Sequence, residues 1–307
     1  MSALQDVLDR QGFVILDGGL ATQLERHGAD LNDPLWSGKI LLESPELVER
    51  VNYDYFVAGA DVGVSASYQL TFPGLLQKGF SAAEAEAVLR ESIAVTRRAA
   101  ARVPRTGLLI AASVGPYGAY LHDGSEYRGD YRLSSGEFKE FHRPRLTILA
   151  SCEPDLIAFE SIPNLHEAEA LAELMSEFPH LPAWLSFTCI DAVHISDGTA
   201  FREAVAALER FPQIAAVGLN CTPPRHVSNL LSLAATATSK PLVAYPNSGE
   251  CFFPDSGIWG STNELGIIEH AAADWFRCGA RLIGGCCRTT PETIRAIRLA
   301  VARAALC

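Results

Sequence analysis

The sequence has no long apolar run, and its most apolar segments are much shorter than the roughly 20 residues that a membrane-spanning helix needs. The first ten residues also differ from a secretory leader. Asp6 and Asp9 stand where such a leader needs a basic flank followed by an apolar stretch. We therefore expect a cytoplasmic protein that has no membrane partner.

Basic residues are scarce relative to acidic ones. The 307 residues include 25 Lys and Arg against 36 Asp and Glu, which gives a formal net charge of −11. No nucleic-acid partner is expected, because non-specific binding to nucleic acid relies on Lys and Arg to neutralise phosphates. The eight cysteines are too few for a disulfide scaffold of this length. In a reducing compartment they serve as buried apolar residues, metal ligands or reactive thiols.

Several common catalytic motifs are missing. No Gly-x-Gly-x-x-Gly follows a predicted strand, and the chain has no Walker motif and no Gly-x-Ser-x-Gly turn. The eight histidines include no His-x-x-x-His pair. A zinc hydrolase with His and carboxylate ligands is therefore disfavoured, and so are nucleotide-binding and serine-hydrolase functions.

Short apolar runs alternate with helical segments along the whole chain. The runs are continuous rather than alternating, which is typical of parallel strands buried on both faces. Eight such units without a break predict a single (β/α)8 TIM barrel domain over residues 1–307, with its catalytic face at the C-terminal ends of the strands. Two long connections, 115–133 and 247–263, follow strands and are expected over that face. The predicted strands are 13–16, 61–65, 108–113, 156–159, 183–187, 214–217, 241–245 and 281–283.

Three cysteines stand at the ends of two predicted strands. Gly218-Leu-Asn-Cys221 ends the sixth strand and Gly284-Gly-Cys-Cys287 ends the eighth, two positions away around the ring. Three converging thiolates suit tetrahedral zinc with one open position, and the glycines allow a close backbone approach. We therefore predict one Zn²⁺ per chain, held by Cys221, Cys286 and Cys287.

The spacing of these cysteines leaves other interpretations open. All three are ordinary buried residues in one alternative, and Cys286 and Cys287 form a vicinal disulfide in another, as in a redox sensor on a barrel scaffold. Cys189 ends the fifth strand and is a rival ligand. The remaining cysteines lie on predicted helices, a loop or the C-terminal tail, and no role is assigned to them: Cys152, Cys251, Cys278 and Cys307.

Two acidic residues also stand at strand ends. Asp17 begins an Asp-Gly-Gly turn before a helix, where free N–H groups can hold a carboxylate while Asp17 accepts from an ammonium group. Glu160 follows the fourth strand. The plainer alternatives are that Asp17 caps its helix and that Glu160 forms a structural ion pair. Three thiolates leave zinc formally anionic, which favours holding a fourth thiol as a nucleophile. We therefore expect alkylation of a thiol, with both acids holding the substrate.

These residues resemble a known family. The segments 17–22 (Asp-Gly-Gly-Leu-Ala-Thr), 218–221 and 284–287 look like the signature segments of the zinc-dependent homocysteine S-methyltransferases. Segments 113–120, 123–131, 245–250 and 287–291 are similar to the bacterial and plant type that uses S-methylmethionine or S-adenosylmethionine. The resemblance implies a (β/α)8 barrel and zinc on the three cysteines. It also implies an enzyme that methylates L-homocysteine to methionine with a small sulfonium donor.

The resemblance also implies individual substrate contacts. Asp17 and Glu160 match acids that hold the homocysteine amino group, Gly18, Gly19 and Thr22 match the turn near its carboxylate, and Asn220 is placed beside them. Gln69 departs from the betaine-dependent type and so supports a sulfonium donor. The sequence indicates neither the preferred donor nor the oligomeric state. The candidate donor contacts are Trp36, Tyr68, Gln69, Tyr117 and Asn247, with Tyr120 and Tyr127 as further aromatic candidates.

Overall fold

The computed structural model describes residues 2–250, 252–253, 258–260 and 264–306, with backbone alone at 252–253 and 258–259. Cys251 and Cys307, to which the sequence assigned no role, lie outside the described residues. Part of the predicted 247–263 connection lies outside them as well.

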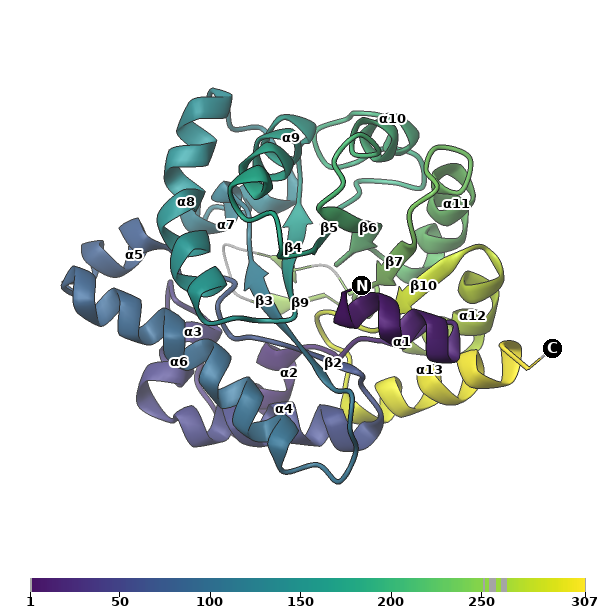
Figure 1. Cartoon of the computed structure of the whole chain (residues 1–307), viewed down its shortest axis with the longest axis horizontal. Coiled ribbons are helices and arrows are strands. Elements are labelled where there is room, and N and C mark those ends of the chain that lie inside the picture. Colours follow the sequence, from purple (N-terminus) through teal and green to yellow (C-terminus); the bar gives the residue numbers. More distant parts are fainter. Residues whose placement is uncertain (1, 251, 254–257, 261–263, 307) are drawn as a thin grey trace.

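Eight parallel strands form the ring that the sequence predicts, with helices around it (Figure 1). The hydrogen-bonded order is β1-β10-β7-β6-β5-β4-β3-β2, and a parallel bridge between Leu16 and Val62 joins its two ends. The predicted (β/α)8 barrel is therefore confirmed. The strands are β1 (Val14–Ile15), β2 (Val62–Val64), β3 (Leu109–Val114), β4 (Leu156–Ile162), β5 (Ala183–Phe187), β6 (Ile214–Asn220), β7 (Leu242–Tyr245) and β10 (Ala280–Ile283).

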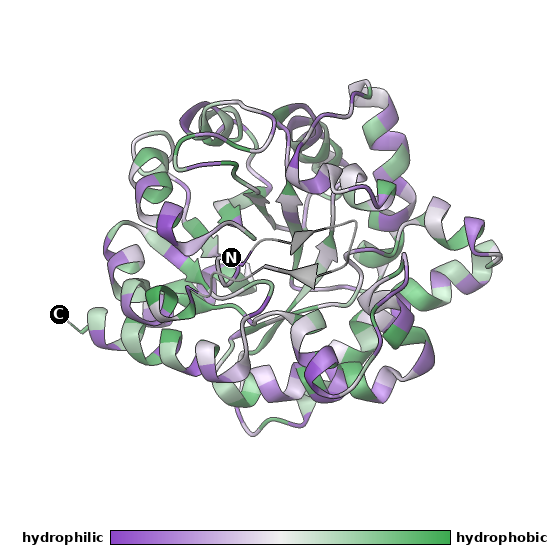
Figure 2. Ribbon diagram, turned by 180° about the vertical axis from the view of Figure 1, so that it is seen from behind, coloured by the Kyte–Doolittle hydropathy of each residue, from purple (hydrophilic) through white to green (hydrophobic). Residues whose placement is uncertain are grey.

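Some of the helices around the ring begin or end at recognisable capping residues. Ser81 and Ser134 each form a capping box, and Gly59 ends its helix at φ +119°. In Figure 2 these helices carry bands of hydrophobic and hydrophilic residues, as expected for helices with one buried face. They are α2 (Leu20–Arg26), α4 (Pro45–Ala58), α6 (Ala82–Ala101), α8 (Ser135–Ser151), α9 (Leu165–Leu174), α10 (Phe201–Ala207), α11 (Pro224–Ala234), α12 (Leu265–Arg277) and α13 (Pro291–Ala304).

Several short elements are additional to the predicted ones. Most lie in connections that follow strands, and apart from the nine-residue α1 they are too short to show a helical or strand period in the sequence. No helix of the described residues has both the length and the apolar character required to cross a bilayer. The additional elements are α1 (Ala3–Gln11), α3 (Ser37–Glu43), α5 (Phe72–Gln77), α7 (Tyr117–Leu121), the 3₁₀ turns η1 (Ser125–Tyr127) and η2 (Met175–Glu177), and the antiparallel pair β8 (Phe252–Phe253) and β9 (Ile258–Trp259).

The apolar core has two layers. A large outer layer lies between the strands and the surrounding helices. A smaller inner layer fills the barrel itself, where Trp184 and Leu282 pack among other inward-facing strand residues. Leu4 and Val7 of α1 join this inner layer, so α1 covers the N-terminal end of the barrel. The barrel is thus filled and closed at one end, and only its other end is left for a site.

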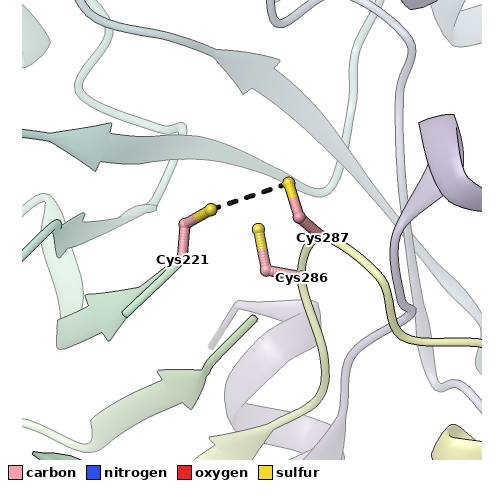
Figure 3. Close-up of side chains that lie close together, drawn as sticks. All are labelled: Cys221, Cys286 and Cys287. Atoms are coloured by element: carbon pink, nitrogen blue, oxygen red, sulfur yellow. Dashed lines mark hydrogen bonds between the residues drawn. The ribbon is translucent and has the colours of Figure 1, made fainter. Parts of the chain in front are cut away.

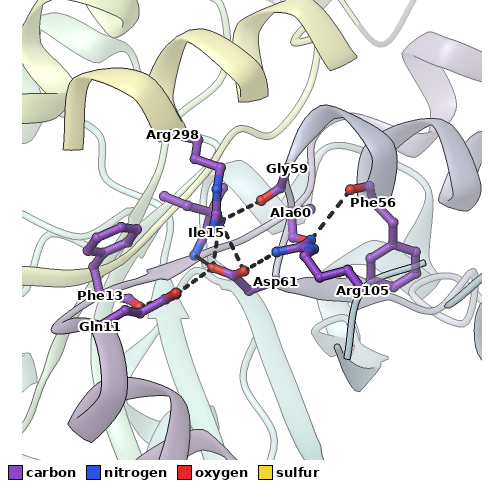
Figure 4. Close-up of polar contacts among 9 residues, drawn as sticks. All are labelled: Gln11, Phe13, Ile15, Phe56, Gly59, Ala60, Asp61, Arg105 and Arg298. Carbon is purple, nitrogen blue, oxygen red and sulfur yellow. Dashed lines mark hydrogen bonds and ion pairs between the residues drawn. The ribbon is translucent and has the colours of Figure 1, made fainter. Parts of the chain in front are cut away.

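The ring closes through a short seam between β1 and β2. Asp61 lies at the N-terminal end of this seam, where its Oδ2 accepts from the Ile15 N–H at 2.9 Å (Figure 4). The same carboxylate accepts from Gln11 at the end of α1 at 2.8 Å, from Arg105 after α6 at 2.5 Å and from Arg298 of α13 at 2.9 Å. One buried acid therefore ties α1, the segment after α6 and α13 to the barrel seam.

Asp17 performs the same task at the other end of the seam. It directly follows β1, and its Oδ2 accepts from the Val64 N–H of β2 at 2.7 Å. The two aspartates supply acceptors along an edge where only Leu16 and Val62 form a strand bridge. Barrel closure thus depends on side chains as well as on backbone pairing.

We predict that Asp61→Asn lowers the free energy of unfolding by about 3 kcal/mol, because it leaves two partly buried arginines without their shared anion. Chemical denaturation measures this loss. Asp155→Asn is the matched control, since Asp155 also accepts a strand N–H, from Ile110, with no ion pair among the described residues. We expect it to cost about 1 kcal/mol. Equal losses in the two variants would contradict a special role for the Asp61 ion cluster.

Candidate metal centre and substrate cavity

Three thiols meet at the C-terminal end of the barrel. The Sγ atoms of Cys221, Cys286 and Cys287 all lie within 4.8 Å of one another, and those of Cys221 and Cys287 are 3.6 Å apart (Figure 3). Cys221 follows β6, and the other two follow β10, with β7 between these strands. The convergence that the sequence predicts is therefore present.

The last residue of β7 and the segment that follows it hold both cysteine-bearing turns in place. The Cys221 N–H donates to the Tyr245 carbonyl at 3.2 Å, and the Cys286 N–H donates to the Pro246 carbonyl at 2.8 Å. Asn247 Nδ2 donates to the Cys221 carbonyl at 3.2 Å. These contacts set the distance between the two turns, because one short segment is bonded to both.

Close backbone packing explains the glycines beside the cysteines. A Cβ on Gly218 would collide with the carbonyl oxygen of Val243, and a Cβ on Gly285 would collide with the side chain of Thr289. Cys221 itself has φ +46°, in the left-handed region that non-glycine residues rarely adopt. The backbone thus turns sharply where its thiol enters the cluster.

The three thiols share their protons unequally. The thiols of Cys286 and Cys287 hold the pKa of Cys221 well below its usual value, because each can donate to a Cys221 thiolate. The pKa values of Cys286 and Cys287 are raised, chiefly by the neighbouring Cys221 sulfur. The Tyr127 hydroxyl lies 3.5 Å from Cys221 Sγ, and Asn220 Nδ2 lies 3.8 Å from Cys286 Sγ. The cluster therefore favours one thiolate, with hydrogen-bond donors around it.

The donor set fits a soft divalent metal. Three sulfurs within a few ångströms, with a cavity on their open side, match a zinc site that has three protein ligands and one exchangeable position. Cys189 is buried and is not part of this cluster, and burial raises its thiol pKa. Cys286 and Cys287 are both free thiols in the structure. The arrangement thus offers Cys221, Cys286 and Cys287, and not Cys189, as ligands.

A cavity of about 890 Å³ opens beside the thiols. This volume is within the range of cavities that bind small molecules. No Lys or Arg is among the described residues that line it, and burial lowers the pKa of its one histidine, His122. It is therefore an acidic pocket. The predicted residues along it are Asp17, Gly18, Gly19, Thr22, Trp36, Tyr68, Gln69, Tyr127, Glu160, Asn220 and the three cysteines.

Asp17 and Glu160 both present carboxyl groups to this cavity. Glu160 accepts from the hydroxyl of Ser113, and from the Tyr245 hydroxyl at 3.2 Å. Burial raises the pKa of Glu160 to about 7. Burial also raises the pKa of Asp17, and the nearby charge of Glu160 raises it further, whereas the Val64 N–H lowers it. Each acid therefore keeps its proton more readily than a free carboxyl does, until a cation enters the cavity.

The Asp17-Gly-Gly turn differs in one respect from the prediction of free backbone donors. The Gly19 N–H donates to Thr289 Oγ1 at 3.1 Å, and Thr22 Oγ1 accepts from the Arg288 N–H at 2.8 Å. A Cβ on Gly18 would lie 2.7 Å from the ring of Tyr55. The turn is thus packed against the segment that follows Cys287, and at Gly19 the donor is already used. The sequence could not show this contact, because its partners are about 270 residues apart.

The candidate donor contacts divide into two groups. Trp36 and Tyr68 form an edge-on aromatic pair, 6.3 Å between ring centroids, on one wall of the cavity. Gln69 lies beside them and donates to the Ala119 carbonyl at 3.0 Å. Tyr117 packs instead among other aromatic rings, and Asn247 bonds to the Cys221 carbonyl. Neither of these two residues is among the described residues that line the cavity.

A buried network of Arg145, His142 and Glu167 supports the aromatic wall. Arg145 of α8 donates to the carbonyls of Tyr68, at 3.2 Å, and Gly115, at 2.8 Å. It also lies 2.8 Å from His142 Nδ1, and His142 Nε2 lies 2.7 Å from Glu167. Burial lowers the pKa of Arg145 to about 10. Arg145 therefore fixes the backbone at Tyr68 and at Gly115, where the 115–133 connection begins.

Some residues at the site were not among the predicted contacts. Ser113 and Tyr245 hold Glu160, and both end predicted strands, so strand position could have indicated them. Glu126 lines the cavity from η1, inside the long connection. Burial raises its pKa to about 7. The sequence predicted that this connection lies over the catalytic face, but no local pattern shows that Glu126 is the residue that reaches the cavity.

Comparison with known proteins agrees with this geometry. The family model described as homocysteine S-methyltransferase matches residues 14–301. The chain is 47% identical to homocysteine S-methyltransferase YbgG of Bacillus subtilis, over 97% of each chain. It is 46% identical to homocysteine S-methyltransferase 4 of Zea mays, over 97% of this chain and 92% of that one. The metallated form of the Escherichia coli homocysteine methyltransferase MmuM superposes with a TM-score of 0.88 at 44% identity, over 97% of this chain and 99% of that one. The chain belongs to the homocysteine S-methyltransferase family.

Proposed function

We propose that this chain is a zinc-dependent homocysteine S-methyltransferase, a single barrel domain over residues 1–307 that transfers a methyl group from S-methylmethionine or S-adenosylmethionine to L-homocysteine. The observation that carries the proposal is the convergence of three thiols within 4.8 Å beside an acidic cavity. Cys221, Cys286 and Cys287 would hold the ion. Because these thiols must stay reduced, we propose the cytoplasm as its compartment.

Zinc on three thiolates would bind the homocysteine sulfur at its open position and keep it anionic and nucleophilic at neutral pH. The chain's own residues place the reactants. Asp17 and Glu160 receive the homocysteine ammonium, and the Trp36–Tyr68 wall receives the donor. The methyl carbon then moves in line from the donor sulfur to the homocysteine sulfur, and the bonding electron pair stays on the donor sulfur. A sulfonium donor leaves as a neutral thioether.

The hydrogen-bond donors around the sulfurs balance the excess negative charge. Tyr127 can donate its hydroxyl to Cys221, and Asn220 can donate its amide to Cys286. The Asn220 Oδ1 accepts from the Ser161 N–H at 2.7 Å and from the Ser186 hydroxyl at 2.9 Å. These two hydrogen bonds fix the orientation of Asn220. We propose that its amide positions the Cys286 sulfur at the edge of the homocysteine site.

We predict that Cys221→Ser loses stoichiometric zinc and at least about 100-fold in methyl transfer, while the fold persists. Elemental analysis, a coupled methionine assay and the melting temperature measure the three quantities. Cys189→Ser is the matched control, since Cys189 is a buried cysteine outside the cluster. Full activity in a zinc-free Cys221→Ser protein would refute the mechanism. Wild-type protein that binds no stoichiometric zinc would favour the redox-sensor alternative.

The raised pKa of Glu160 predicts a pH dependence of homocysteine binding. The carboxyl is protonated below about pH 7 and charged above it, and only the charged form pairs with the ammonium group. The KM for homocysteine should therefore fall as the pH rises towards 7 and level off above it. Initial rates across about pH 5.5 to 9 measure this.

The comparison variant is Glu160→Gln, which should have a KM at pH 8 raised by at least about tenfold and should lack the change near pH 7. Ionisation of the homocysteine thiol affects both proteins equally, so the difference between them isolates Glu160. Identical pH profiles in the two proteins would show that Glu160 does not hold the ammonium group.

A further inference from the structure

Glu126 differs from the other acids around the cavity. Its Oε2 is fully buried and has no hydrogen-bond partner. No described residue forms an ion pair with it, whereas Asp30, Asp33 and Glu25 at the same cavity pair with lysine or arginine. Asp17 and Glu160 also have protein donors. A buried carboxylate oxygen without a donor is costly unless a ligand satisfies it.

The backbone around Glu126 is fixed by several elements. Its carbonyl accepts from Thr188 Oγ1, just after β5, at 3.0 Å. A Cβ on Gly118 of α7 would lie only 2.7 Å from the Glu126 nitrogen, so this turn packs tightly against α7. The next residue, Tyr127, contacts Cys221 Sγ at 3.5 Å. The acid is therefore held beside the thiol cluster by its backbone.

The wall on which Glu126 lies is the aromatic one. The cavity lining includes Glu126 together with Tyr127, Tyr68 and Trp36. Burial raises the pKa of Tyr68, and the nearby charge of Glu126 raises it further. Aromatic faces and a carboxylate together make a site for a large, weakly hydrated cation.

We propose that Glu126 binds the positively charged sulfonium centre of the methyl donor and thereby selects cationic over neutral donors. This inference rests on the proposed function. Asp17 and Glu160 are already available for the homocysteine ammonium, and Glu126 is a further acid of the cavity without a described lysine or arginine partner, available for a second cation. The sulfonium provides it, and no lysine or arginine among the described lining residues competes for the acid.

Removal of the Glu126 charge should affect the KM for the donor and kcat differently. The donor loses its positive charge as the methyl group leaves, so Glu126 stabilises the bound donor more than the transition state. Removing the acid charge should raise the KM for the donor without lowering kcat. A residue that only supports the fold would reduce kcat or the melting temperature instead.

The test uses Glu126→Gln in the full, zinc-loaded chain, with two ligands of the same shape. One is S-methylmethionine, and the other is homoleucine, in which a CH group replaces the sulfonium sulfur. Calorimetry should show S-methylmethionine binding weakened by about tenfold or more, and homoleucine binding changed by less than about twofold. The KM for homocysteine should also stay within about twofold. Asp30→Asn is the matched control, since it removes an exposed acid at the rim of the same cavity.

Three results would overturn the proposal: equal weakening of both ligands, no weakening of either, or the same loss in Asp30→Asn. Zinc content and melting temperature establish that each variant is folded, and Glu126→Ala replaces Glu126→Gln where the latter does not fold. Failure of the proposed function is a separate result, because the wild-type protein would then transfer no methyl group from S-methylmethionine or S-adenosylmethionine. Normal wild-type transfer with an unchanged Glu126→Gln variant would refute only the role of Glu126.

Discussion

Closure of the strand ring is the constraint on which the rest of the structure depends. The thiols come from β6 and β10, and they meet only because β7 lies between these strands in a ring of fixed size. The ring closes at its weakest edge, between β1 and β2, where Asp61 and Asp17 accept backbone N–H groups from the facing strand. An open sheet of the same strands would not hold the β1 end beside β2, and the cavity would lose one wall.

Charge is the second organising principle. The cavity is lined by acids and thiols with no lysine or arginine among its described residues, so it is strongly electronegative when the sulfurs are ionised. Such a pocket attracts cationic and zwitterionic amino acids and repels free anions. Burial raises the pKa values of Asp17, Glu126 and Glu160, which reduces the repulsion among them while the cavity is empty. Acidity and burial together thus favour substrates that bring positive charge.

The sequence predicted most of the barrel and the thiol cluster of the site, for identifiable reasons. Strands such as 108–113 are continuous apolar runs between long helices, which is the pattern expected for the buried strands of a parallel barrel. Cys221, Cys286 and Cys287 stand at strand ends, where ring geometry brings distant residues together. α1 and η1 were not predicted, because both are short and are held by contacts with distant parts of the chain. Glu126 and the Gly19–Thr289 hydrogen bond depend on such contacts, and single-sequence patterns do not record them.

Asp17 links two properties of the molecule that are usually separate. One of its oxygens accepts the hydrogen bond that joins the end of β1 to β2, and its carboxyl also faces the cavity. A replacement at this position would alter both the closure of the barrel and the charge of the cavity. Selection for a different cavity wall at Asp17 would therefore also act on the stability of the whole fold.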